Sequence, residues 1–170
     1  MITVRRASID DAQELVRLRG VLLTTLDGRP PEPGPWQDEA LGTLRRRLAD
    51  PEGTLAAYVV DKPDAPDELA ACVVGVIEHR LGGPINPSGA TGYVFNVATD
   101  PGHRRRGYAR ACLEALLDWY HHRGVTVIEL KASEDGESIY RALGFAPTTA
   151  RTLRLTVVDD VERIRARLAP

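Results

Sequence analysis

A basic loop at the start of a helix is the segment of this sequence best suited to bind an anion. The loop and the first helical turn comprise Arg104, Arg105, Arg106, Gly107, Tyr108, Ala109 and Arg110. Small residues at this point let main-chain N–H groups approach a ligand, and the helix N-terminus adds the positive end of its dipole. The arginines add charge-assisted hydrogen bonds to phosphate oxygens. The pattern therefore favours a diphosphate cradle over its alternative, a solvated basic helix start.

This loop differs from the two common nucleotide-binding loops. A P-loop ends in Gly-Lys followed by Ser or Thr, and residues 104–110 contain no lysine. The dinucleotide-binding fingerprint requires three glycines at a fixed spacing, and that spacing is also missing. The sequence therefore disfavours both of these nucleotide-binding sites.

Two segments resemble the GNAT superfamily of N-acetyltransferases. Residues 104–109, RRRGYA, preceded by Asp100-Pro101 and an expected strand, resemble the acetyl-CoA signature of that superfamily, usually written Q/R-x-x-G-x-G/A. Residues 139–145, IYRALGF, resemble its closing helix, which commonly reads L-Y-x-x-x-G-F. With the order of strands and helices, the resemblance covers nearly the whole chain, although the N-terminal half matches only in architecture. It implies acetyl-CoA as co-substrate and no metal.

The resemblance also implies how acetyl-CoA would be held. The pantetheine arm would pair with the main chain of a strand that splays from its neighbour, here Val97, Ala98 and Thr99. The diphosphate would accept hydrogen bonds from main-chain N–H groups of residues 105–110, and an N–H near Val97 would stabilise the oxyanion. Ser133 occupies a position where many family members have an asparagine that contacts pantetheine. Capping of the following helix is the alternative role of Ser133.

Tyr140 matches the tyrosine that acts as general acid in the family. A phenol with a pKa of about 10 can protonate a thiolate whose pKa is near 8.5. The alternative is that its ring only packs against the long helix. The general base is less evident, because the strand before the signature lacks the glutamate that many family members carry there. Asn96 could position a water or the amine, and Glu78 could act as base through water.

These residues need a particular set of elements to bring them together. Apolar periodicity and turn residues predict strands at 2–6, 55–60, 69–79, 93–99, 125–130 and 152–158. They also predict a helix opened by a Ser8–Asp11 capping box, helices at 36–48, 105–123 and 134–143, and a charged C-terminal helix. Hairpins combined with one strand-helix-strand crossover give an α/β (α+β) fold with a mixed, mostly antiparallel sheet flanked by helices. We expect a single domain over residues 1–170.

Composition narrows the functional class. The 170 residues are 43% apolar and carry a formal charge of -2, which gives no general attraction to nucleic acid or to acidic membranes. Cys72 and Cys112 are too few for a disulfide scaffold and suit a reducing compartment. The N-terminal residues do not resemble an export signal, and no apolar run reaches membrane-spanning length. We therefore expect a cytoplasmic protein without nucleic-acid or membrane partners.

The predicted function is direct transfer of an acetyl group from acetyl-CoA to a primary amine. The acceptor, a small molecule or a peptide, is not identified by any sequence pattern. A non-catalytic acyl-CoA-binding regulatory module on the same fold is the first alternative, and a ligand-free interaction domain is the second. Because dimers are frequent in the family, the resemblance also admits a homodimer.

Overall fold

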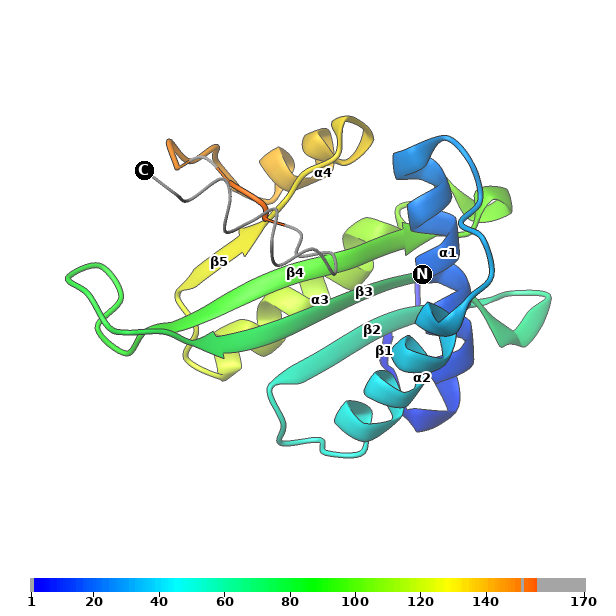
Figure 1. Ribbon diagram of the computed structural model, residues 1–170, viewed down its shortest axis with the longest axis horizontal. Helices are drawn as coiled ribbons and strands as arrows, with labels where there is room; N and C mark the ends of the chain where they lie inside the picture. The colour runs from blue at the N-terminus through cyan, green and yellow to red at the C-terminus, as the bar shows by residue number, and fades with distance from the viewer. Residues whose placement is uncertain (1, 151, 156–170) are drawn as a thin grey trace, which may run out of the picture.

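The computed structural model describes residues 2–150 and 152–155, which form one sheet with helices on both faces (Figure 1). The strands are β1 (Arg5–Arg6), β2 (Leu55–Lys62), β3 (Ala65–His79), β4 (Ala90–Thr99) and β5 (Val127–Leu130). The helices are α1 (Ala12–Asp27), α2 (Pro35–Leu48), α3 (Tyr108–His122) and α4 (Glu137–Ala142). Short 3-10 turns cover residues 9–11, 101–103 and 134–136.

The sheet has the strand order β1-β2-β3-β4-β5. The first three pairings are antiparallel, and only β4 and β5 run parallel, joined by the α3 crossover. The prediction of a mixed, mostly antiparallel sheet flanked by helices is therefore confirmed. The parallel pair matters most for function, because the predicted cradle lies between β4 and α3.

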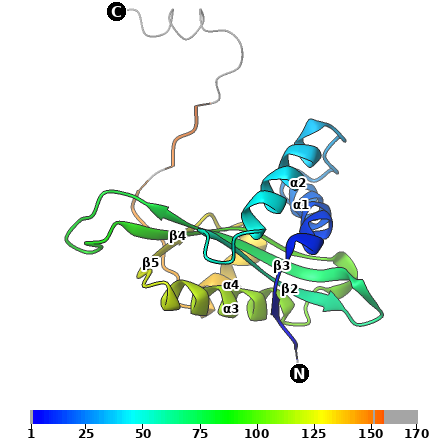
Figure 2. The same ribbon diagram turned by 90° about the horizontal axis from the view of Figure 1, so that it is seen from below.

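Helices α1 and α2 cover one face of the sheet, and α3 and α4 cover the other (Figure 2). We call these the α1 face and the α3 face. Tyr120 of α3 is fully buried, and its hydroxyl donates to the carbonyls of Val76 (3.1 Å) and Tyr93 (2.9 Å). A Cβ atom at Gly92 would lie 2.8 Å from the Tyr120 ring, so this glycine lets α3 pack closely under β4. The free thiols of Cys72 and Cys112 are buried, as expected for core residues.

Several predicted boundaries were wrong, for identifiable reasons. The helix predicted at 105–123 begins only at Tyr108, because Arg105 (φ 60°) and Gly107 (φ 81°) adopt left-handed backbone conformations. The predicted strand at 2–6 is reduced to Arg5–Arg6. The Ser8–Asp11 capping box is present, but it caps a 3-10 turn that leads into α1.

The C-terminal predictions have a different outcome. The helix predicted at 134–143 is divided into a 3-10 turn and the short α4. Residues 152–155 of the predicted strand at 152–158 are not in a strand. The remainder of that strand and the predicted C-terminal helix lie outside the described residues.

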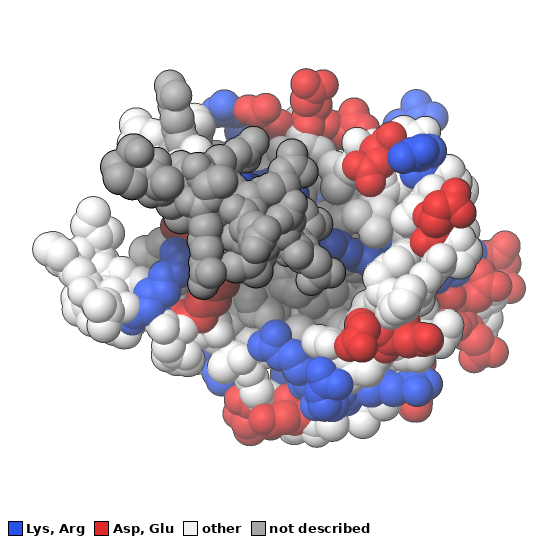
Figure 3. All heavy atoms as spheres, viewed as in Figure 1, with Lys and Arg blue, Asp and Glu red and all other residues white. Residues whose placement is uncertain are grey.

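The surface of the described residues is mixed in charge. Acidic and basic side chains are interspersed on the face that carries α1 and α2 (Figure 3). The hairpin between β3 and β4 exposes two large apolar side chains, Leu81 and Ile85. None of the described helices combines the length and the apolar character needed to cross a membrane.

Candidate active site

The loop before α3 has the backbone geometry of an anion cradle. Arg105 and Gly107 both have positive φ, so the loop curls immediately before the helix begins. The first helical hydrogen bond is donated by Ala111 to the carbonyl of Gly107 at 3.0 Å. The N–H groups of the preceding residues of α3, Tyr108 to Arg110, therefore have no acceptor within the helix. Such N–H groups, together with the helix dipole, favour an anion at this point.

The arginine side chains of the loop lie on the surface. The Arg104 guanidinium donates to Thr25 Oγ1 of α1 at 3.2 Å, and Arg106 donates to the carbonyl of Gly102 at 3.4 Å. Arg110 forms an exposed ion pair with Glu114 at 2.8 Å. Exposed pairs of this kind contribute little to stability. The arginines can therefore turn toward a ligand at small cost.

Asp100 fixes the start of this loop. Its carboxylate accepts from Arg17 of α1 at 2.8 Å, lies 3.3 Å from Lys62 Nζ at the end of β2, and accepts from the N–H of Gly102 at 3.2 Å. Burial alone would raise the pKa of Asp100, but the hydrogen bonds from Arg17 and Lys62 outweigh it and lower the pKa to about 2. Asp100 thus connects the cradle to α1 and to the sheet.

β4 and β5 separate just before the residues where the resemblance places the pantetheine. Their pairing runs from Thr91–Val127 to Val94–Leu130 and then stops, whereas β4 continues to Thr99 along β3. The main chain of Val97, Ala98 and Thr99 therefore has no β5 partner on that side. An extended ligand with amide groups can hydrogen-bond to such an edge.

A β-bulge lies at the start of the splay. Cys72 pairs with Ala98 and Val74 pairs with Phe95, so Asn96 and its neighbour together oppose a single residue of β3. Asn96 has φ 52°, a conformation that asparagine tolerates better than most residues. Its buried side chain accepts from Arg19 at 3.5 Å and approaches Cys72 Sγ at 3.7 Å. Asn96 therefore shapes the backbone of the splay, and its amide group already has protein partners.

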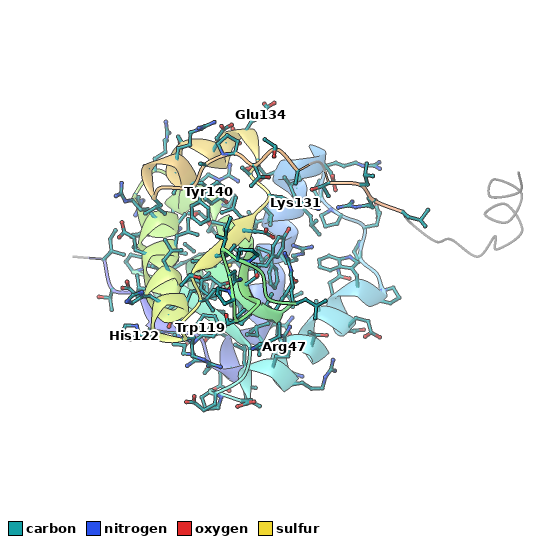
Figure 4. The ribbon with its side chains drawn as sticks, turned by 90° about the vertical axis from the view of Figure 1, so that its left-hand side faces the viewer. Arg47, Trp119, His122, Lys131, Glu134 and Tyr140 are labelled. Carbon is teal, nitrogen blue, oxygen red and sulfur yellow. The ribbon has the colours of Figure 1, made fainter. Side chains whose placement is uncertain are left out.

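Tyr140 belongs to α4, and its side chain is buried on the α3 side of the sheet, whereas Lys131 lies toward α1 (Figure 4). Its ring contacts Phe145 edge-on, with centroids 6.1 Å apart. A Cβ atom at Gly136 would lie 2.9 Å from this ring, so the glycine makes room for it. Burial raises the pKa of Tyr140, which keeps the phenol protonated. No hydrogen bond to its hydroxyl is present among the described residues.

Ser133 immediately precedes the 3-10 turn that leads to α4. Its main-chain carbonyl accepts from the N–H of Gly136 at 3.1 Å, but its side chain makes no capping hydrogen bond. The alternative that Ser133 only caps a helix is therefore wrong for its hydroxyl. Contact of this hydroxyl with pantetheine stays a prediction.

The structure does not bring Glu78 to the splay. Glu78 pairs in register with Thr91, four residues before Phe95, which corresponds to roughly 13 Å along a strand. Its carboxylate accepts from Arg80 at 2.7 Å. Glu78 therefore has no direct access to the point where β4 and β5 separate, and its predicted action as a base through water stays a prediction.

Sequence reasoning missed Glu129 of β5. It lies opposite Tyr93, one residue before the last paired residue of β5, and its carboxylate is partly exposed on the α1 face. With Tyr93, Lys131 and Phe145 it lines a cavity of about 420 Å³. The charged Glu129 inside the short apolar strand VIEL was a usable signal. It was missed because it follows the signature at residues 104–109, whereas the glutamate of many family members precedes it.

A family model and several known proteins match this chain. The model of the acetyltransferase (GNAT) family matches residues 23–145. The ribosomal protein bS18-alanine N-acetyltransferase of Escherichia coli is 41% identical over 72 residues, which are 41% of this chain and 49% of that protein. The chain thus spans about half the length of the curated relatives it matches.

Solved structures support the same assignment. A predicted acetyltransferase from Clostridium acetobutylicum, solved with acetyl-CoA, is 25% identical with a TM-score of 0.77, covering 92% of this chain and 96% of that chain. A GCN5-related N-acetyltransferase from Ralstonia eutropha is 25% identical with a TM-score of 0.73, covering 91% and 99%. Because the family model matches well over half of the sequence, and the fold agrees, this chain belongs to the acetyltransferase (GNAT) family.

Proposed function

We propose that the protein is an N-acetyltransferase that transfers the acetyl group of acetyl-CoA directly to a primary amine. The observation that carries the proposal is the combination of the unpaired β4 edge, the cradle before α3 and a buried, protonated Tyr140 on α4. Family membership and a structural neighbour solved with acetyl-CoA support it. When bound, acetyl-CoA supplies the acetyl group as a reactive thioester.

The chain would hold acetyl-CoA mainly through its own main chain. The N–H groups that begin α3 would donate to the diphosphate, and Arg104 to Arg106 would add positive charge. The free edge of β4 at Val97 to Thr99 would pair with the amides of the pantetheine arm. The Ser133 hydroxyl makes no capping hydrogen bond, so it would be available for one further hydrogen bond to the pantetheine arm.

We assign the general base to Glu129, in place of Glu78. An amine attacks only in its neutral form, so a base must take a proton from the incoming ammonium ion. Glu129 supports this role by its place on the α1 face beside the splay and by the cavity that it lines. One of its carboxylate oxygens, Oε1, has no hydrogen bond among the described residues, whereas Oε2 accepts from Arg80.

We assign the general acid to Tyr140. A phenol with a pKa of about 10 is a weaker acid than a thiol with a pKa near 8.5, so Tyr140 can protonate the departing thiolate only when its hydroxyl lies within hydrogen-bond reach of the sulfur. Burial raises the pKa of Tyr140, so the phenol is in the protonated form that a general acid requires. Glu129 on the α1 face and Tyr140 on the α3 face would thus act from opposite sides of the sheet.

The α-amine of a peptide is the acceptor class that we propose. The support is the matched relative from Escherichia coli, which modifies an alanine of a ribosomal protein. Small-molecule amines are the competing class, because an aminoglycoside N-acetyltransferase has the same fold, with a TM-score of 0.68 at 18% identity.

The test is thiol release from acetyl-CoA in the presence of a panel of amines. The panel contains peptides that begin with alanine, the same peptides with a blocked N-terminus, lysine-containing peptides and an aminoglycoside. Release with the free N-terminus alone is the expected result. Thiol release at background level with every amine, together with a clear thermal shift on acetyl-CoA binding, would instead indicate a binding module.

A further inference from the structure

Three charged side chains form a continuous ion-pair cluster on the α1 face. Arg80 follows the last residue of β3, and its guanidinium reaches across β4 to β5. Nε and Nη2 donate to Glu78 Oε2 at 3.0 and 2.7 Å, and Nη1 donates to Glu129 Oε2 at 3.0 Å. The main-chain N–H of Arg80 is fixed by the carbonyl of Gly89 at 3.0 Å. The main chain of Arg80 is thus anchored in the stem of the β3–β4 hairpin.

Because Arg80 contacts only one of them, the two oxygens of the Glu129 carboxylate have different surroundings. Oε2 is held by the guanidinium, and Oε1 has no hydrogen bond among the described residues. The Glu129 side chain is 44% exposed, so without this contact it would sample several rotamers. The Arg80 guanidinium is held by a second carboxylate, that of Glu78, and its hydrogen bond to Oε2 therefore favours one orientation of the Glu129 carboxylate.

We propose that Arg80 is a positioning residue that holds the Glu129 carboxylate in one orientation, with Oε1 available to the acceptor amine. This inference rests on the proposed function, because it requires Glu129 to be the base. Arg80 does not touch the reacting atoms and acts through the carboxylate. It also separates Glu129 from Glu78, whose negative charge would otherwise disfavour a second carboxylate nearby.

Among the described residues, the other charged groups near Glu129 do not form ion pairs with it. The titratable and charged groups that surround it are Glu78, Arg80, Tyr93, Lys131, Glu137 and Arg141. Arg141 forms an ion pair with Glu137 at 2.8 Å on α4. Within this group, the Arg80 guanidinium donates a hydrogen bond to Glu129. Removing Arg80 therefore changes the orientation of the Glu129 carboxylate most directly.

The proposal is tested with Arg80→Gln, and Arg141→Gln is the matched control. The control removes the same charge from the lining of the same cavity but leaves the Arg80–Glu129 contact intact. The readouts are kcat and KM for the acceptor at neutral pH, measured by thiol release. Arg80→Gln should lower kcat roughly tenfold with little change in KM, because the carboxylate loses its fixed orientation. Arg141→Gln should leave kcat close to the wild-type value, and Arg80→Lys should recover part of kcat.

The Glu129→Gln background separates the two hypotheses. If Arg80 acts through Glu129, adding Arg80→Gln to Glu129→Gln should cause no further loss. A wild-type kcat in Arg80→Gln, with strong loss in Glu129→Gln alone, would overturn the role of Arg80 and leave the base assignment standing. Full activity in Glu129→Gln would instead overturn the base assignment.

Discussion

The two sides of the β4–β5 splay are built on different principles. On the proposed cofactor side, the available groups are main-chain N–H and C=O groups of β4 and of the first turn of α3, positioned by Gly107 and by a bulge at Asn96. On the proposed acceptor side, they are side chains such as Arg80, which follows β3, and Glu129 of β5, which meet only through strand register. A ligand common to a whole family can be held by backbone, whereas selection among acceptors requires side chains that can change.

The largest expected effect comes from Tyr140, the proposed general acid. Tyr140→Phe should lower kcat by about 100-fold or more, since it removes the proton donor to the leaving thiolate. Binding of acetyl-CoA should be preserved, because the ring still fills the space beside Phe145. Single-turnover acetyl transfer and acetyl-CoA affinity would be measured together. Full turnover in this variant, with the cofactor bound, would contradict the assignment of the acid.

The same contrast explains what the sequence could predict. The loop at 104–110 and the closing helix at 139–145 are local patterns, and their positions follow from a strand, a turn and an amphipathic helix. The mixed, mostly antiparallel character of the sheet also followed, because hairpins and one crossover leave few topologies. The partnership of Arg80 with Glu129 joins residues 49 positions apart, and it depends on the register of three strands. No local pattern encodes that register, and therefore Glu78 was chosen in place of Glu129.

Asp100 holds the cradle loop against α1 through its ion pair with Arg17. Its lowered pKa means that the folded state binds this proton more weakly than the unfolded state does. The resulting stability, about 2 kcal/mol, is therefore fully present above pH 4 and is lost as the pH falls toward the folded value of about 2. Asp100→Asn should lose this contribution at neutral pH.

The Asp100 prediction is checked by urea unfolding from pH 7 to pH 2. The wild type should lose stability relative to Asp100→Asn across the lower part of this range, so that the two curves converge. Parallel curves over the whole range would show that the Arg17–Asp100–Lys62 contacts do not stabilise the protein. Acetyl-CoA affinity in Asp100→Asn would then report whether the loop needs this anchor.

The arginine side chains of the cradle should contribute less to the free energy of acetyl-CoA binding than its main-chain N–H groups do. Arg104→Glu combined with Arg106→Glu should weaken acetyl-CoA binding roughly tenfold, because two exposed attractive charges become repulsive. The loss should shrink as salt is raised, since exposed charges are screened. Calorimetric titration at low and high ionic strength measures both effects. Unchanged affinity at low salt would place the diphosphate elsewhere.

The smallest predicted effect concerns Ser133, and it separates ligand binding from folding. A hydroxyl that capped the turn before α4 would reduce the unfolding free energy when removed, typically by about 1 kcal/mol. The Ser133 side chain makes no such bond, so Ser133→Ala should leave thermal stability unchanged in the absence of ligand. If the hydroxyl contacts pantetheine, the Kd for acetyl-CoA should rise by roughly 2- to 10-fold. A lower melting temperature with unchanged Kd would reverse this assignment and return Ser133 to a purely structural role, which would leave the unpaired β4 edge as the main contact for pantetheine.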